Sequence, residues 1–299
     1  MKRIIILLFV FQPLISQISI TEVAINDDQG IYDSLNNFVG KNPKQMIGQT
    51  LFLKPKPESL RKYGYDYFYK SLEAPRLTST VNKFKCCEGY NSKYKLLQSK
   101  SFKVLSIVPD KKPYSNDAYL ELEMIETGEK TYFKYSMVYD FNFPFIIMGH
   151  FDKLKELYVG EDVLIRTKAV INIDSGNEMD ITPGEYHKVL DVTLDSKYFV
   201  LSLLLQNKNG ERFMYDAEYK DRDPSEIIFK EEAEKYKTKY GQKNWIEILN
   251  KKVVTGWTEE MVVLSWGKPK EINRSSYSDQ WVYSNQYLYF EDGILISFN

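Results

Sequence analysis

Apolar and polar residues alternate in short segments through the middle of the chain, and Gly, Asn and Asp separate one segment from the next. Lys103–Ile107 and Lys188–Val192 are two of these segments. Alternation with a period of two places the apolar side chains on one face of a β-strand. Short strands joined by turn residues are typical of small barrels and sandwiches. We therefore expect small antiparallel β-barrels in this part of the chain.

The same order of segments occurs twice. Each copy opens on a glycine within an apolar run, continues with an alternating segment, and later has a Gly-Glu pair before a basic residue. The corresponding segments are Met46–Leu53 with Tyr158–Ile165, Lys103–Ile107 with Lys188–Val192, and Gly128–Lys130 with Gly210–Arg212. The sequence thus predicts a degenerate duplication. Its joint lies around Asn142–Leu154, where Pro144 and Gly149 interrupt the alternation.

The first copy carries a long insertion, because 55 positions separate Gly48 from Lys103 whereas 28 separate Gly160 from Lys188. Between residues 41 and 112 there are sixteen Lys or Arg against five Asp or Glu, which favours an anionic partner. Long loops on small barrels often bind ligands, and lysine beside exposed tyrosine suits anions and sugar rings. The candidate surface consists of Lys56, Arg61, Lys62, Tyr63, Tyr65, Tyr67, Tyr69, Lys83 and Lys85. In the alternative interpretation, these tyrosines form one face of an ordinary strand and the lysines are solvated.

Cys86 and Cys87 are the only cysteines, and they are adjacent. This excludes a disulfide framework. A bridge between neighbouring residues closes a strained ring, so we expect reduced or partly buried thiols, with intermolecular bridging as the alternative. The pair is a candidate redox-sensitive site. Metal binding is not expected there, because neither His150 nor His187 has ligand spacing to the pair.

The last quarter of the chain predicts a small α+β unit. Thr258 is a good N-cap, Trp257 and Val262 have the spacing of a hydrophobic staple, and Gly267 suits a helix end. A charged helix is expected upstream, from about Ser225 to Tyr240. The elements that follow the capped helix are strands at Gln280–Tyr283, Tyr287–Phe290 and Ile294–Phe298, with a hairpin turn at Asp292-Gly293. We expect Trp257, Trp266 and Trp281 to supply the core of this unit.

This spacing of Gly256-Trp257-Thr258, Trp266-Gly267, Trp281-Val282-Tyr283 and Asp292-Gly293 resembles the SmpA/BamE-like family of envelope modules, in the version that ends many Bacteroidetes proteins. The resemblance covers roughly Phe229–Asn299 and implies an assembly or interaction module without catalytic residues. The openings of the two middle copies resemble the entry into bacterial SH3-like barrels. The predicted fold is therefore mostly β with an α+β tail: two small antiparallel SH3-like barrel modules followed by a BamE-like helix–helix–β-hairpin module.

The N-terminus has the outline of a secretory signal peptide. Lys2 and Arg3 precede the apolar run Ile4–Phe11, which is too short to span a bilayer, and small polar residues follow at Ser16 and Gln17. The predicted segments are a signal peptide at 1–17, a lead segment at 18–40, a first barrel module with a long basic insertion at 41–141, a second barrel module at 142–221 and the tail module at 225–299.

The sequence contains no catalytic motif such as a Gly-rich phosphate loop, HExxH or GxSxG. The polar run Asn172–Asp180 misplaces the glycine of a calcium loop and lacks its closing Glu. His187 begins a predicted strand with no Ser or Cys nucleophile motif around it. We therefore predict no catalytic, cofactor-binding or metal-binding residues and no cofactor.

These observations predict an exported, non-catalytic binding or scaffold protein of the bacterial cell envelope, periplasmic or secreted after signal-peptide cleavage. The expected partner is an envelope protein or an anionic envelope component such as lipid head groups or acidic glycan. Nucleic acid is not expected, and membrane contact is expected to be peripheral unless the signal remains uncleaved. The alternative is a carbohydrate-active or glycan-binding protein that uses the Tyr-rich loop.

Overall fold

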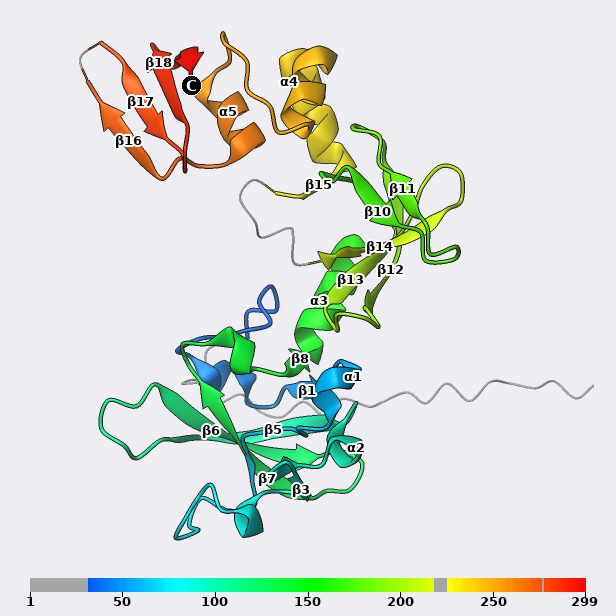
Figure 1. Cartoon of the computed structure of the whole chain (residues 1–299), viewed down its shortest axis with the longest axis vertical. Helices are drawn as coiled ribbons and strands as arrows, with labels where there is room; N and C mark the ends of the chain where they lie inside the picture. The colour runs from blue at the N-terminus through cyan, green and yellow to red at the C-terminus, as the bar shows by residue number, and fades with distance from the viewer. Residues whose placement is uncertain (1–31, 218–224, 276) are drawn as a thin grey trace, which may run out of the picture.

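The computed structural model describes residues 32–217, 225–275 and 277–299, which form three successive bodies along the longest axis of the molecule (Figure 1). Three clusters of buried apolar side chains correspond largely to these three bodies. The fold is mostly β and consists of several small antiparallel sheets. The predicted signal peptide and residues 18–31 of the lead segment lie outside the described ranges. Within those ranges, no helix combines the length and apolar character that a membrane crossing requires.

An antiparallel sheet of six strands forms the first body. In pairing order the strands are β2 (Phe68–Tyr69), β7 (Lys130–Ser136), β6 (Asp117–Met124), β5 (Ser101–Pro109), β1 (Thr50–Leu53) and β8 (Phe145–Ile147). Every second residue of β7 is buried, as alternation predicts. Phenylalanine rings fill the core, with centroids 5.0 to 5.9 Å apart. The residues concerned are Phe68, Phe102, Phe133 and Phe145.

The predicted insertion lies between β1 and β5, and its middle returns to the sheet as β2, which pairs with β7. Buried Tyr94 and Leu97 anchor its end in the same core. A short turn of helix, η1 (Pro43–Met46), precedes β1. The other elements of the insertion are α1 (Glu58–Arg61), η2 (Thr80–Asn82), the hairpin of β3 (Cys86–Glu88) and β4 (Asn91–Ser92), and α2 (Tyr94–Leu97).

Helix α3 (Met148–Tyr158) leads from β8 into the second body, where its buried Leu154 and Tyr158 join the core. This body is an antiparallel sheet of five strands. In pairing order they are β14 (Arg212–Asp216), β13 (Leu201–Gln206), β12 (His187–Leu194), β9 (Asp162–Ile165) and β15 (Ile227–Phe229). A separate hairpin of β10 (Ala169–Ile171) and β11 (Glu178–Asp180) lies between β9 and β12 in the chain.

The two sheets share one topology, as the duplicated sequence pattern predicts. The order β7-β6-β5-β1-β8 in the first sheet matches the order β14-β13-β12-β9-β15 in the second. The registers also agree, because Thr50 pairs with Lys103 in the first sheet and Asp162 pairs with Lys188 in the second. These residues occupy the same places in the two sequence copies.

Two finer details repeat as well. The amides of Gly48 and Gly160 donate to the carbonyls of Val104 and Val189, each at 2.9 Å. Both glycines have positive φ, 82° and 89°, which explains why each copy opens on this residue. Immediately beyond each hydrogen bond the strand register shifts, between Val104 and Ser106 in one copy and between Val189 and Asp191 in the other.

The third body, the tail, consists of two helices and a four-stranded antiparallel sheet. Its elements are α4 (Lys230–Leu249), α5 (Glu259–Trp266), β16 (Glu271–Arg274), β17 (Asp279–Val282), β18 (Tyr287–Glu291) and β19 (Ile294–Phe298). The predicted cap is confirmed, because the Thr258 side chain accepts a hydrogen bond from the amide of Met261. Trp257 and Val262 are buried, and Gly267 ends the helix with φ 84°. Gly241 interrupts α4 with φ 77°.

Three short strands differ from the sequence-based expectation. Ile227–Phe229 was predicted within a helix of the tail, but it forms β15 and pairs with β9 of the second sheet. An apolar run of this kind suits a strand buried on both faces better than a solvent-facing helix. Likewise, β8 lies within the predicted second module but pairs with β1 of the first sheet. The expected strands of the tail omitted β16, whose four residues are all exposed and lack apolar alternation.

Arg166 joins the second body to the tail. It follows β9, is 5% exposed, and donates to three backbone carbonyls in the last turns of α4 and α5. These are the carbonyls of Ile248 at 3.0 Å, Leu264 at 3.0 Å and Ser265 at 2.7 Å. Helix ends leave such carbonyls without partners and carry negative charge, so a buried cation satisfies them. Leu164 and Ile228 of the second sheet belong to the apolar cluster of the tail, so the two bodies share a core.

Candidate functional site

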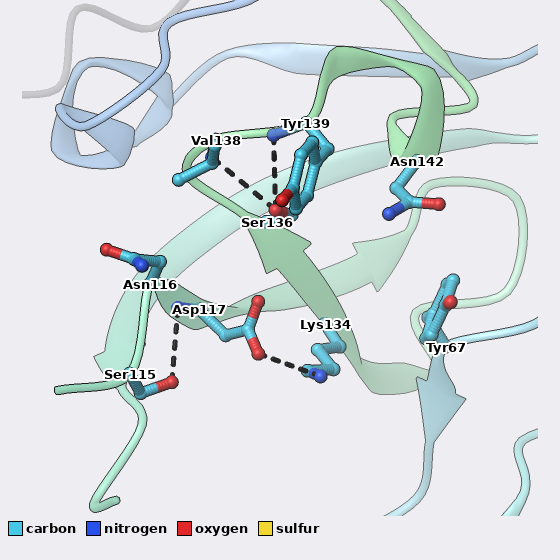
Figure 2. Close-up of a pocket in the computed structure, with 9 residues that line it drawn as sticks. All are labelled: Tyr67, Ser115, Asn116, Asp117, Lys134, Ser136, Val138, Tyr139 and Asn142. Carbon is cyan, nitrogen blue, oxygen red and sulfur yellow. Dashed lines mark hydrogen bonds and ion pairs between the residues drawn. The ribbon is translucent and has the colours of Figure 1, made fainter. Parts of the chain in front are cut away.

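A polar pocket of about 410 Å³ opens at one end of the first sheet. Three connections that are distant in sequence form its walls: the insertion before β2, the loop from β5 to β6, and the segment from β7 to β8 that includes η3 (Asp140–Asn142). We call it the Tyr67 pocket. Its lining residues are Tyr67, Ser115, Asn116, Asp117, Lys134, Ser136, Val138, Tyr139 and Asn142 (Figure 2).

Backbone hydrogen bonds hold the three walls together. The Tyr67 carbonyl accepts from the amide of Lys134 at 3.0 Å, and the Asn116 carbonyl accepts from the amide of Met137 at 2.8 Å. Tyr67 has φ 71°, a left-handed conformation that costs about 1 kcal/mol or more in a residue with a Cβ. Backbone strain of this kind concentrates at functional sites. The Ser136 hydroxyl accepts from the amides of two lining residues, Val138 and Tyr139.

An ion pair lies at the base of the pocket. Lys134 Nζ is 2.8 Å from an Asp117 carboxylate oxygen, and Figure 2 shows the two side chains facing each other across adjacent strands. Partial burial lowers the pKa of Lys134, but the hydrogen bond and charge of Asp117 outweigh it, so the pKa lies above its usual value. The ammonium therefore stays protonated, and the ion pair places one positive and one negative group at the base of the pocket.

One strongly exposed aromatic side chain, Tyr139, lines the pocket, and Phe141 packs against it. Tyr139 is 56% exposed, Phe141 is 78% exposed, and their ring centroids are 5.4 Å apart. Tyr114 directly precedes the lining residue Ser115, is fully exposed and has φ 58°. Exposed aromatic rings beside a small set of fixed polar groups are characteristic of recognition sites.

The polar groups of the pocket are suited to holding a ligand by hydrogen bonds. Its one lining carboxylate, Asp117, is paired with the Lys134 ammonium, whose pKa is raised. The other polar groups are amides and hydroxyls that donate and accept hydrogen bonds. The lining contains neither a histidine nor a cysteine.

The structure separates the four candidate tyrosines of the insertion. Tyr65 and Tyr69 are 1% and 2% exposed and belong to the interior, so the sequence-based assignment of these two to a ligand-binding surface is corrected. The Tyr65 hydroxyl donates to the Lys54 carbonyl at 2.7 Å. Tyr63 is exposed, and Tyr67 lines the pocket. The alternative interpretation is wrong as well, because only Tyr69 of the four lies in a strand, β2, and the four tyrosines do not share one face.

Most of the candidate basic residues have partners inside the protein. Lys83 is 5% exposed and pairs with Asp66, so it too lies away from any surface. The other contacts are those of Lys85 with Glu129, of Lys56 with the Gly64 carbonyl and the Tyr65 ring, of Arg61 with the Lys56 carbonyl and the Tyr94 ring, and of Lys62 with the Tyr63 ring. Internal contacts therefore hold many of these basic side chains and leave fewer of them available to an anionic partner.

Cys86 and Cys87 form a disulfide in the structure, whereas the sequence favoured reduced thiols. The pair begins β3, and Cys87 is exposed at the β3–β4 hairpin. The role of the pair as a redox-sensitive site stays a prediction.

Sequence reasoning found one wall of the pocket and missed the others. Tyr67 was named because it belongs to the Tyr-rich insertion. The sequence around Asp117 and Lys134 gives no sign of a binding site, because a single charged residue in a strand is common. A weak signal did exist in the segment that contains Tyr139 and Phe141, because aromatic residues lie directly before the predicted joint at Asn142.

Both histidines are buried. His150 is 3% exposed and its Nδ1 lies 2.9 Å from the Ser34 carbonyl oxygen. His187 is 1% exposed, packs edge-on against Phe213, and has no hydrogen-bond partner in the described ranges. In the same ranges, no group of three or more His, Cys, Asp or Glu residues is placed to hold a metal ion.

The burial of His187 predicts that stability depends on pH. Burial lowers the pKa of its imidazole, although the charge of Glu185 opposes the shift, so the folded state favours the neutral ring. The unfolded chain takes up a proton near pH 6.5. Stability is therefore full above about pH 6.5 and falls below it, by at most about 1.4 kcal/mol per pH unit. Urea unfolding followed by circular dichroism should show a lower midpoint at pH 5 than at pH 7.5.

In the variant His187→Gln this part of the pH dependence disappears. An unchanged pH profile in His187→Gln would contradict the assignment.

No family model matches this chain, and neither does any curated protein or solved structure with which it was compared. The geometry of the described residues is therefore the basis for the function proposed below.

Proposed function

We propose that this chain is an exported, non-catalytic binding protein of the bacterial cell envelope that holds a polypeptide segment in the Tyr67 pocket. One observation carries the proposal: three connections that are distant in sequence converge on a pocket that combines a fixed ion pair with exposed aromatic rings. The pKa of Lys134 is raised in that pair, so its ammonium stays protonated.

The chemistry of the pocket favours a polypeptide as the ligand. An extended peptide has amide donors and acceptors at regular spacing, which the side-chain amides of Asn116 and Asn142 can match. Apolar side chains of the ligand would pack on Tyr139 and Phe141, because exposed aromatic residues are the usual anchors of protein interfaces. A charged side chain of the ligand would interact with the Asp117–Lys134 pair and fix the register.

The sequence resemblances are consistent with this role. The shared strand order of the first two bodies supports their assignment as tandem SH3-like barrels, and the order of two helices followed by a sheet supports a BamE-like tail. The N-terminal pattern at residues 1–17 supports export. Together these features favour a scaffold that presents one barrel to a partner protein.

The proposal predicts which side chains control the affinity for peptides. A library of random peptides displayed on phage would be selected for binding to the full-length chain. The affinity of a selected peptide would then be measured by isothermal titration calorimetry. Removing the exposed rings in the double variant Tyr139→Ala/Phe141→Ala is expected to weaken binding at least about tenfold, since anchors of this kind contribute more than about 1.4 kcal/mol.

Tyr90→Ala is the matched control, because Tyr90 is 81% exposed on the β3–β4 hairpin and does not line the pocket. Its affinity is expected to equal that of the unmodified protein. The proposal fails if no peptide is enriched, or if the selected peptides bind the double variant as tightly as the unmodified protein.

A further inference from the structure

A second pocket, of about 640 Å³, lies where the tail meets the second body, and the proposed function does not use it. We call it the Trp266 pocket. Trp266 at the end of α5 and Tyr283 just after β17 provide its aromatic walls. The polar residues that matter for the argument are Glu226, Lys251, Asn285 and Gln286.

Trp266 differs from the other three tryptophans of the chain. Those three are 2 to 4% exposed and form the core of the tail, as the sequence predicts for two of them, whereas Trp266 is only partly buried. Its indole nitrogen donates to the Lys251 carbonyl at 2.8 Å, so the polar end of the ring is satisfied. The expectation that Trp266 is simply core is therefore corrected.

The two rings form a fixed corner. The Tyr283 hydroxyl donates to the Gly267 carbonyl at 2.8 Å, which anchors this ring by its polar end as well. The ring centroids are 5.4 Å apart and the ring planes meet at 82°. Rings held at such an angle cannot both stack on one flat aromatic ligand. They can, however, contact two sides of a puckered ring, because the negative faces of aromatic rings attract weakly positive C–H groups.

The polar groups around this corner both donate and accept hydrogen bonds. Glu226 and Lys251 are 2.7 Å apart in an ion pair, so their opposite charges cancel and the pocket has little preference for a charged ligand. The amides of Asn285 and Gln286, in the turn between β17 and β18, each carry a donor and an acceptor. Ligand hydroxyls, which also donate and accept, match this set better than a phosphate or a carboxylate does.

We propose that the Trp266 pocket binds a neutral sugar ring, so that the tail contacts uncharged glycan. The C–H faces of the sugar pack on Trp266 and Tyr283, while its hydroxyls bond to the ion pair and the two amides. This site differs from the Tyr-rich loop that the sequence suggested for glycan, because it lies in the tail. Neutral glycan at the tail and a peptide at the first barrel would allow the chain to connect two envelope components.

Tryptophan fluorescence tests the proposal directly. The full-length chain would be titrated with maltotriose, cellotriose, mannotriose, xylotriose and chitotriose. Its retardation would also be measured by electrophoresis in gels that contain the corresponding polysaccharides. Because the other tryptophans are buried, a ligand that covers Trp266 is expected to shift the emission to shorter wavelength. Trp266→Ala is expected to weaken binding at least about tenfold.

Two further variants keep the test interpretable. Asn285→Ala/Gln286→Ala changes only exposed side chains and should weaken binding without affecting folding, which circular dichroism checks. Tyr277→Ala removes an 88% exposed ring outside the pocket and should bind as the unmodified protein does. The proposal is overturned if no member of the panel binds at millimolar concentration. It is also overturned if binding survives both pocket variants, or if Tyr139→Ala rather than Trp266→Ala abolishes it.

Discussion

The variant Arg166→Ala is expected to destabilise the tail by about 3 kcal/mol, because hydrogen bonds from a charged donor contribute more than neutral ones and their buried acceptors would be left unpaired. Three carbonyls, those of Ile248, Leu264 and Ser265, would lose their shared donor. Burial of this arginine is nearly complete. Water therefore cannot replace the lost donor without opening the joint between the second body and the tail.

The four tryptophans make the measurement selective. Trp245, Trp257, Trp266 and Trp281 all lie in the tail, so fluorescence during urea unfolding reports on this body. In Arg166→Ala the fluorescence transition is expected at a clearly lower urea concentration. Arg166→Lys should give an intermediate midpoint, because an ammonium keeps the charge but cannot reach several carbonyls with a planar fork.

Arg212→Ala is the matched control for the loss of an arginine. Arg212 pairs with Asp174 on the surface, where both side chains are about half exposed, so its removal should leave the fluorescence midpoint unchanged. The interpretation of Arg166 as the joint between two bodies would be refuted if Arg166→Ala unfolded at the same urea concentration as the unmodified protein.

The repeated fold could be predicted from the sequence because its signals are local. Gly48 and Gly160 need positive φ at the same point of each copy, and the alternating strands that follow have one buried face. The capping of α5 is equally local, since the Thr258 side chain reaches an amide three residues away. Such features depend on neighbouring residues and are therefore visible in the chain alone.

The elements that were misplaced depend on distant partners. β8 and β15 have three residues each, and the sheet to which each belongs is decided by pairing with β1 or β9, tens of residues earlier. A short apolar run does not encode that choice. β16 could not be predicted for a different reason: all four of its residues are exposed, so they show no apolar alternation. It forms a strand because it pairs with β17.

The candidate site was only partly predictable for a related reason. Composition identified the insertion that carries Tyr67, but a pocket is defined by the loops that meet it. Asp117 and Lys134 come together because β6 and β7 are adjacent, and Asn142 approaches from a third segment. Composition also could not separate Tyr65, which faces the core, from Tyr63, which faces solvent.

Phe145→Ala is expected to destabilise the first body by about 3 to 5 kcal/mol, the range for removing a buried phenylalanine ring. Phe145 is fully buried and contacts a group of aromatic rings whose centroids lie 5.0 to 5.9 Å away. A large cavity would remain, because β8 is fixed on β1 by its backbone pairing and cannot move inward. Circular dichroism should show a transition at a lower urea concentration than in the unmodified protein.

The duplication supplies the control for this experiment. Ile227 occupies the position in the second sheet that Phe145 occupies in the first, since they pair with Ile165 and Leu53 respectively. Because β15 leads directly into α4, and Ile228 belongs to the core of the tail, Ile227→Ala should lower the tryptophan transition as well. Phe145→Ala should leave that transition in place, because Phe145 and the tryptophans belong to different buried clusters. If Phe145→Ala lowered both transitions equally, the three bodies would unfold as one cooperative unit. The separate buried clusters would then not correspond to parts that unfold independently.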